Sequence, residues 1–197
     1  METSDKLVQR KQLRQLIRGR RQALSALTQA SAQESLKNQF IKLFASDKPE
    51  SIAIYLANDG ELDTLKLINH CWQQNIDVYL PVIHPFSRHH LLFQQYTPTT
   101  KMVLNRFGIS EPKLNSQSTI CPQNLSVLCT PLVAFDSQGN RMGMGGGFYD
   151  RTLSQLQQSK TKVIGLAHDC QQVDSVPVEP WDMPLSMIMT PTKIINC

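Results

Sequence analysis

One stretch of the sequence combines backbone and side-chain features that bind phosphate. Residues 139–147 contain five of the chain's nine glycines, with Arg141 among them and Asp150 close behind. Glycine permits positive φ and lets backbone N–H groups approach a ligand, and a guanidinium binds phosphate through paired hydrogen bonds. The glycines alone are equally typical of a tight strand-to-helix connection, and their order matches neither the P-loop nor the dinucleotide fingerprint. Arg141 shifts the interpretation toward phosphate.

Two aspartates are candidate metal ligands. Asp150 would repel bound phosphates unless it caps the following helix or holds the magnesium ion that accompanies a nucleoside triphosphate. Asp182 stands next to Trp181 in the proline-bounded segment 179–184, where an aspartate usually forms local hydrogen bonds. Trp181 itself either covers a ligand ring or fills a hydrophobic gap. Only a partner in space would make Asp182 a metal ligand.

The positive charge of the chain is concentrated near its N-terminus. Residues 1–21 carry a local charge of +5, whereas the whole chain carries +4. Arg10, Arg14, Arg18 and Arg21 follow one another at steps of four, four and three, so they share one face of a helix. Such a row either stays solvated or points at an anion. Nucleic acid is a weaker alternative, because no aromatic residue for base stacking is interleaved with the arginines.

The remaining pattern alternates between strand and helix periods. A capping box at residues 31–34 predicts a second helix to about residue 45, after the basic helix, whose apolar stripe contains Leu13, Leu16, Ile17, Leu24 and Leu27. We then predict strands at 51–56, 76–82, 91–96, 125–132, 162–167 and 185–190, and helices at 61–73 and 148–158. Residues 97–123 are polar, contain several prolines and predict a long surface excursion.

This alternation predicts a three-layer α/β/α sandwich with a mostly parallel sheet. The glycine-rich segment then joins a strand to a helix at the carboxyl edge of the sheet, where α/β proteins bind ligands. The length of 197 residues, without a break in composition, predicts one domain over residues 1–197.

Several classes of protein and site are disfavoured. No apolar run is long enough for a membrane span, and the N-terminal residues lack the apolar block of a signal peptide, so we expect a cytoplasmic protein. The five cysteines are scattered and form no C-x-x-C pair, which indicates reduced thiols. His84, His89 and His90 lack zinc-ligand spacing and are expected at the surface.

The segment "NRMGMGGGFYDRTL" closely resembles the signature R-[LM]-G-x-G-x-G-[FY]-Y-D of the 5-formyltetrahydrofolate cyclo-ligase family, also called 5,10-methenyltetrahydrofolate synthetase. The resemblance extends to "RKQLR" near the N-terminus, to "YLANDGELDT", to "FGISEP" and to the late P-x-x-x-W-D-x-P turn, in the family's order. It therefore covers nearly the whole chain.

The resemblance implies an enzyme that uses ATP and Mg²⁺ to convert 5-formyltetrahydrofolate to 5,10-methenyltetrahydrofolate, with release of ADP and phosphate. It also implies a Rossmann-like fold, which agrees with the sandwich predicted from the periods. A phosphorylated formyl group, an iminophosphate, would be the intermediate. Such a transfer requires mainly positioning and charge stabilisation from the protein.

Site residues follow from the resemblance by position. We predict Arg141 and Tyr149 as catalytic residues and Asp150 and Asp182 as magnesium ligands. Glu61, Met144 and Phe148 would contact folate, together with three loop glycines. Nucleotide contacts are assigned to Arg10, Lys11, Arg14, Arg141, Gly143, Gly145, Gly146, Gly147 and Tyr149, of which Gly145, Gly146 and Gly147 also contact folate. Some relatives have a basic residue within the glycine run, where this chain has Met144 and Gly146, so backbone donors must do more of the phosphate binding here.

Two other functions stay open at this point: a folate or nucleotide carrier without turnover, and a nucleotide-regulated nucleic-acid binder. Retention of Glu61, Arg141, Asp150 and Asp182 together argues against the carrier, which has no need of magnesium ligands. We expect small-molecule substrates as partners, neither nucleic acid nor membrane, and a monomer.

Overall fold

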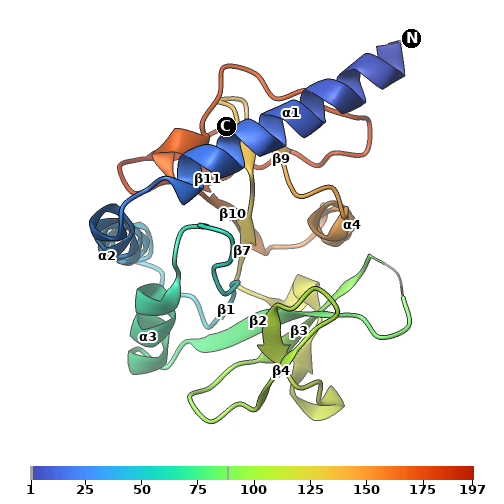
Figure 1. Cartoon of the computed structure of the whole chain (residues 1–197). Coiled ribbons are helices and arrows are strands. Elements are labelled where there is room, and N and C mark those ends of the chain that lie inside the picture. The colour runs from blue at the N-terminus through green and yellow to red at the C-terminus, as the bar shows by residue number, and fades with distance from the viewer. Residues whose placement is uncertain (1, 88) are drawn as a thin grey trace.

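The computed structural model describes residues 2–87 and 89–197, and an eight-stranded sheet forms its centre (Figure 1). The strand order is β12 (Ile194–Asn196), β11 (Met187–Met189), β10 (Lys162–Leu166), β7 (Val127–Pro131), β1 (Ser51–Ala53), β2 (Asp77–Ile83), β3 (Leu91–Gln95) and β6 (Thr119–Ile120). The five strands from β11 to β2 pair in parallel, while β12, β3 and β6 join antiparallel at the two edges.

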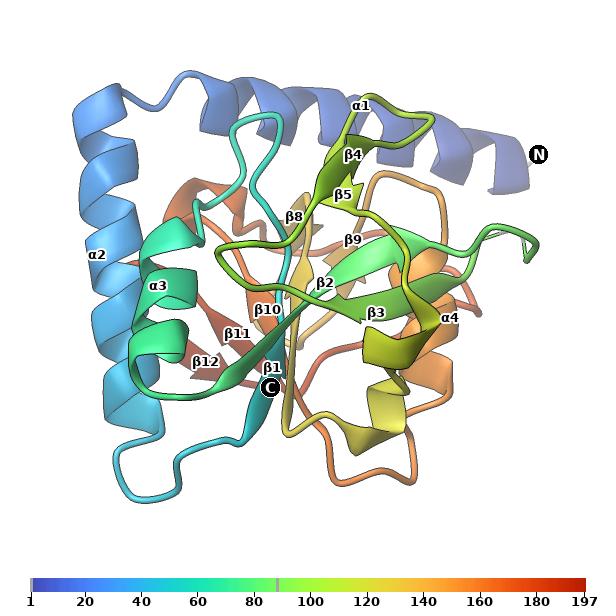
Figure 2. The ribbon, with the colours of Figure 1, turned by 90° about the horizontal axis from the view of Figure 1, so that it is seen from below.

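Helices cover both faces of this sheet (Figure 2). Helices α2 (Ala26–Leu43) and α3 (Leu65–Gln73) share one apolar cluster with Ile52 and Ile54, and α4 (Phe148–Ser154) shares another with Ala53. Successive side chains of β1 thus point to opposite faces, as strand geometry requires. The predicted three-layer α/β/α sandwich with a mostly parallel sheet is confirmed.

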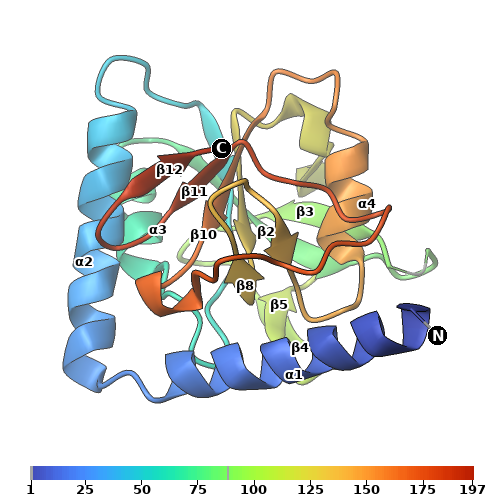
Figure 3. The ribbon, with the colours of Figure 1, turned by 90° about the horizontal axis from the view of Figure 1, so that it is seen from above.

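Helix α1 (Glu2–Gln22) lies across the carboxyl ends of the parallel strands (Figure 3). It contacts the 3₁₀ turn Asp169–Gln171, which follows β10, and the short strand β8 (Ala134–Phe135), which follows β7. Ile17 is fully buried there against Val133, Ala134 and Met142. The expected apolar stripe is partly wrong, because α1 ends before Leu24 and because Leu16 and Leu27 are exposed.

The connections place a ligand-binding edge between β1 and β7. The chain leaves β1 for α3 on one face and leaves β7 for α4 on the other, so the two neighbouring strands form the topological switch point. In open α/β sheets, ligands bind in the crevice outside the carboxyl ends of such strands. The loop that carries Glu61 follows β1, and the glycine-rich segment follows β7.

The differences from the predicted elements are local. The second helix begins at Ala26 and not at the capping box, because the Ser25 hydroxyl already accepts a hydrogen bond from Thr28 N–H at 3.1 Å. Residues 97–123 are more structured than predicted: they contain the hairpin of β4 (Met102–Leu104) and β5 (Ser110–Pro112), the strand β6, and 3₁₀ turns at Ser116–Ser118 and Pro122–Asn124. The hairpin of β8 and β9 (Arg141–Met142) and the edge strand β12 were also not predicted. Such short strands contain too few residues to display a period.

No helix within the described residues is long and apolar enough to cross a membrane.

Candidate active site

The glycine-rich segment forms one wall of an open cleft of about 490 Å³ at the carboxyl edge of the sheet. The cleft is lined by His89, Gly145, Gly146, Gly147, Asp150, Arg151, Ser154, Trp181 and Met183. Gly147, at φ +68°, stands directly before α4 in the left-handed region, which suits a residue without Cβ. Met144 projects from the loop with 57% of its surface exposed.

The backbone of this loop is held through its carbonyl groups. Gly143 C=O accepts from Arg14 Nε at 2.8 Å, Gly147 C=O accepts from Arg151 Nη1 at 3.1 Å, and Gly146 C=O lies 2.8 Å from His89 Nδ1. None of the N–H groups of residues 143–147 donates to another described residue. Consecutive N–H groups without partners, at the edge of a cleft, form an anion-binding concavity.

Asp150 and Arg141 form the ion pair beside the cleft. Arg141 lies on β9, outside the loop itself, and is only 3% exposed. Its Nη2 donates to Asp150 Oδ1 at 2.7 Å, and Met183 N–H donates to the same oxygen at 3.2 Å. Burial lowers the pKa of Arg141, and the nearby Asp150 carboxylate opposes that shift. Arg141 is therefore paired with Asp150 and does not itself line the cleft.

Asp182 is paired with Arg10 through both carboxylate oxygens. Arg10 Nη1 donates to Oδ2 and to Pro177 C=O, and Arg10 Nη2 donates to Oδ1 at 3.2 Å. Glu179 N–H closes the turn by donating to Oδ2 at 2.9 Å. Both side chains of this ion pair are about 8% exposed. Asp182 thus ties the start of α1 to the 179–184 turn.

Of the two predicted magnesium ligands, Asp150 is the better placed to hold a metal ion. The described residues contain no group of three or more Asp, Glu, His or Cys side chains placed to hold a metal. Asp150 Oδ2 accepts no hydrogen bond from a described residue, whereas both oxygens of Asp182 are occupied by Arg10. Mg²⁺ commonly binds one or two carboxylates together with substrate phosphates and water, so Asp150 fits that pattern.

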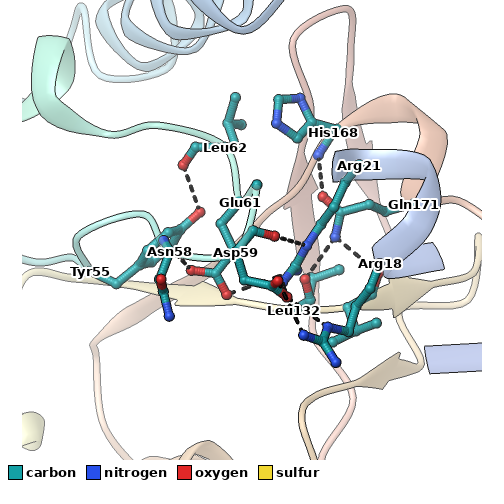
Figure 4. Close-up of polar contacts among 12 residues, drawn as sticks. Arg18, Arg21, Tyr55, Asn58, Asp59, Glu61, Leu62, Leu132, His168 and Gln171 are labelled. Atoms are coloured by element: carbon teal, nitrogen blue, oxygen red, sulfur yellow. Dashed lines mark hydrogen bonds and ion pairs between the residues drawn. The ribbon is translucent and has the colours of Figure 1, made fainter. Parts of the chain in front are cut away.

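The second loop of the site is a tight turn at residues 58–61, held by the other end of α1 (Figure 4). Asp59 and Gly60 have φ of +54° and +73°, and Glu61 N–H donates to Asn58 C=O at 3.0 Å, as in a type I′ turn. The Asp59 carboxylate accepts from Arg18 Nε at 2.6 Å, from Arg21 Nη2 at 2.7 Å and from Gln22. Hydrogen bonding from Arg18 holds the pKa of Asp59 well below its usual range.

Glu61 ends this turn and faces a buried group of polar side chains. Its Oε2 accepts from Asn58 N–H at 3.1 Å, and its Oε1 lies 3.9 Å from Arg21 Nη1. Burial raises the pKa of Glu61, and Arg21 opposes this shift. Tyr149 lies within electrostatic reach of both Glu61 and Arg141, and burial raises its pKa strongly. The Tyr149 ring packs on the α4 face of the core and does not line the cleft.

The structure therefore gathers the predicted residues into two neighbouring groups. Gly145, Gly146, Gly147 and Asp150 line the cleft itself, with Arg14 and Gly143 at its margin. Phe148 lies against His89 and Phe107, at ring distances of 5.6 and 6.5 Å. Glu61 belongs to the second group, with Asp59 and Arg21. Lys11 is exposed on α1 and forms no ion pair with a described residue.

Five residues that line the cleft were not predicted as site residues: His89, Arg151, Ser154, Trp181 and Met183. Arg151 follows Gly147 by four positions, so helical spacing could have placed its guanidinium over the glycine loop. His89 is exposed as predicted, yet it reaches Gly146 across 57 positions of sequence, which no local pattern signals. Trp181 is 66% exposed and lines the cleft, so it is not a hydrophobic plug.

Comparisons with known proteins match this chain along nearly its whole length. The model of the 5-formyltetrahydrofolate cyclo-ligase family matches residues 6–191. A curated 5-formyltetrahydrofolate cyclo-ligase from Haemophilus influenzae is 49% identical over 180 residues, which cover 91% of this chain and 96% of that protein. The cyclo-ligase of Escherichia coli K12 is 46% identical over 179 residues, covering 91% and 98%. The solved structure of Aquifex aeolicus 5,10-methenyltetrahydrofolate synthetase shares the fold at 24% identity, with a TM-score of 0.80 and coverage of 95% of this chain and 92% of that one. The chain belongs to the 5-formyltetrahydrofolate cyclo-ligase family.

Proposed function

We propose that this protein is a 5-formyltetrahydrofolate cyclo-ligase, which closes 5-formyltetrahydrofolate into 5,10-methenyltetrahydrofolate at the expense of ATP. Among the features of the site, the glycine loop carries this proposal: its N–H groups have no partner among the described residues and border a cleft beside Asp150. Such a loop suits the transfer of a phosphoryl group, in which the enzyme contributes positioning and electrostatic stabilisation.

The need for ATP follows from the substrate. A formamide carbon is a poor electrophile, and its oxygen is a poor leaving group when the 10-nitrogen of the folate attacks. Transfer of the γ-phosphoryl group to the formyl oxygen gives an iminophosphate and ADP. Attack by the 10-nitrogen then closes the ring, the 10-nitrogen gives up its proton, and loss of hydrogen phosphate with the formyl oxygen leaves the methenyl bridge. Each step involves charge on phosphate oxygens, which the site must stabilise.

The nucleotide phosphates would bind to the N–H groups of Gly143, Gly145, Gly146 and Gly147. Arg14 and Arg151 already reach this loop from two helices, and each retains guanidinium donors for a phosphate. Lys11 would contribute from the exposed side of α1. Arg10 would leave Asp182 to reach a phosphate, and Arg141 would act through Asp150, which it orients.

Magnesium would be held by Asp150, with Asp182 as a second ligand once Arg10 turns to a phosphate. When bound, the ion would neutralise part of the phosphate charge. The protein's own part is the orientation of Asp150, which Arg141 and Met183 N–H fix through Oδ1 while Oδ2 stays available.

The folate would lie between the two loops. Glu61 would accept hydrogen bonds from its pterin ring, and the backbone of Gly145, Gly146 and Gly147 would meet its formyl end beside the ATP phosphates. Met144 and Phe148 would pack on its apolar surface. Tyr149, which interacts electrostatically with both Glu61 and Arg141, would connect the folate side of the site to the phosphate side.

The test follows the product directly. Purified protein is mixed with 5-formyltetrahydrofolate, Mg²⁺ and ATP, and the absorbance band of the methenyl folate is recorded, with ATP omitted in the control. We expect the band to grow only with ATP. A folded protein that binds both ligands without forming the band would refute the cyclo-ligase activity and favour the carrier.

A further inference from the structure

Arg21 is more deeply buried than its role as an anchor of the Asp59 turn requires. It is 1% exposed, its Nε donates to Asp59 C=O at 2.8 Å, and its Nη2 donates to the Asp59 carboxylate at 2.7 Å. Arg18 and Gln22 already bind the same carboxylate from the accessible side of α1. Burial of a guanidinium destabilises the fold unless its charge and N–H groups are paired, so we expect Arg21 to have a second partner.

That second partner is Glu61. Arg21 Nη1 is buried and forms no hydrogen bond with a described residue, and it points toward Glu61 Oε1 at 3.9 Å (Figure 4). Two carboxylates, Asp59 and Glu61, face two arginines, Arg18 and Arg21. Arg18 contacts only Asp59, whereas Arg21 contacts both carboxylates, so Arg21 supplies the positive charge opposite Glu61.

The surroundings of Glu61 otherwise favour its neutral form. Burial raises its pKa, and Asp59 in the same turn adds to this. Tyr55 and Tyr149 lie within electrostatic reach of Glu61 and carry no positive charge, and the His168 ring lies against the backbone of Gly60 and Glu61 without adding a fixed positive charge. Among the described residues that face Glu61, Arg21 is the one with a permanent positive charge.

The turn also fixes where the Glu61 carboxylate points. Asp59 has a positive φ, a strained conformation for a residue with Cβ, and its contacts with α1 keep it there. Gln29 of α2 adds a hydrogen bond to Gly60 C=O at 3.3 Å. Glu61 Oε2 is engaged by Asn58 N–H, while Oε1 accepts no hydrogen bond from a described residue and remains available to a ligand.

We propose that Arg21 is a positioning residue of the folate site: from beneath the Asp59 turn it fixes Glu61 and supplies the countercharge that keeps this carboxylate ready for the pterin ring. This inference rests on the proposed function, in which Glu61 contacts the folate. Arg21 does not itself touch the substrate.

The experiment compares Arg21→Gln with a matched control, Arg18→Gln, which removes an arginine that contacts Asp59 and not Glu61. KM for 5-formyltetrahydrofolate, KM for ATP and the pH profile of kcat/KM for the folate are measured, and thermal unfolding identifies the folded variants. For Arg21→Gln we expect KM for the folate to rise about tenfold with KM for ATP nearly unchanged. The acid limb of the kcat/KM profile of Arg21→Gln should move up by about one pH unit, because Glu61 loses the positive charge of Arg21, which favours its ionised form. Arg18→Gln should leave the acid limb in place.

Arg21→Lys keeps the positive charge and loses the paired N–H donors of the guanidinium. This variant tests the inference if Arg21→Gln does not fold. We expect its acid limb at the wild-type position and its KM for the folate raised severalfold. A folded Arg21→Gln enzyme with wild-type folate KM and acid limb would overturn the inference. So would an equal shift in Arg18→Gln, or an unchanged folate KM in Arg21→Lys.

If the proposed function is wrong, the wild-type protein will show no ATP-dependent turnover, a result that differs from all those above. In that case the affinity for 5-formyltetrahydrofolate without ATP, measured by calorimetry across pH, replaces KM. Weaker binding by Arg21→Gln and not by Arg18→Gln would still support the inference, and equal binding would reject it.

Discussion

The glycine loop and the Asp59 turn lie at the carboxyl ends of neighbouring strands, yet their hydrogen bonding is opposite. In the loop, the carbonyl groups are engaged and the N–H groups of residues 143–147 have no partner among the described residues. In the turn, the carboxylate and carbonyl groups of Asp59 are bound by three side chains of α1. The N–H groups of the loop are thus available to bind an anion, whereas the groups of the turn are already bound before any ligand arrives.

Asp150→Asn tests the loop side and should have the largest effect. Asparagine keeps an oxygen that accepts from Arg141 and loses the charge that would hold magnesium. We expect kcat to fall about 100-fold at saturating ATP, a value typical for a lost electrostatic contact to the reacting group, with a small change in melting temperature. Steady-state kinetics over a range of Mg²⁺ concentrations checks this. Kinetics equal to wild type would remove Asp150 from the magnesium site.

Asp59→Asn tests the turn side through stability. Asparagine tolerates the positive φ but loses the charge-assisted hydrogen bonds, so we expect a loss of about 2 kcal/mol in the free energy of unfolding near neutral pH. Hydrogen bonding from Arg18 lowers the pKa of Asp59 in the folded protein, so the charged form stabilises the fold above the unfolded pKa of about 4. This contribution disappears as the pH falls through the folded pKa.

The difference between wild type and Asp59→Asn should therefore shrink below about pH 4. Urea unfolding at a series of pH values measures it. A difference that stays constant as the pH falls through this range would show that the Asp59 charge does not stabilise the turn.

Gly147→Ala tests whether the open backbone of the loop is needed. A Cβ at this position would clash with the Arg151 guanidinium, and the φ of +68° strains any L-residue by about 1–2 kcal/mol. Gly108→Ala is the matched control, because Gly108 has φ +72° and open space around its Cβ position. We expect similar losses of stability in both variants and a raised KM for ATP, about fivefold to tenfold, only in Gly147→Ala. Equal ATP kinetics in the two variants would contradict a ligand-binding role for the loop.

The same contrast explains what could be predicted from the sequence. The glycine loop was found because its signal is local: clustered glycines, an arginine and an aspartate within twelve positions. The partners of Arg10, Arg14, Arg18 and Arg21 were not found, because Asp182, Gly143 and Asp59 lie 38 to 172 positions away from them. Spacing placed the arginines on one face, and only the fold shows that this face is packed on the site and not solvated.

The smallest effect should come from Arg14→Ala compared with Lys11→Ala. Arg14 binds Gly143 C=O and lies beside Gly145, so its loss removes both a support of the loop and a donor for phosphate. Lys11 is exposed and supports nothing in the described structure, so it can act only through a bound nucleotide. We expect KM for ATP to rise about fivefold in Arg14→Ala and about twofold in Lys11→Ala, which corresponds to about 1 and 0.4 kcal/mol. Lys11→Ala should retain the wild-type melting temperature, and Arg14→Ala should lose at most a few degrees. If Arg14→Ala instead lost much stability while its KM for ATP stayed unchanged, the arginine would belong to the scaffold, and the anion would be held by the glycine N–H groups and Arg151 alone.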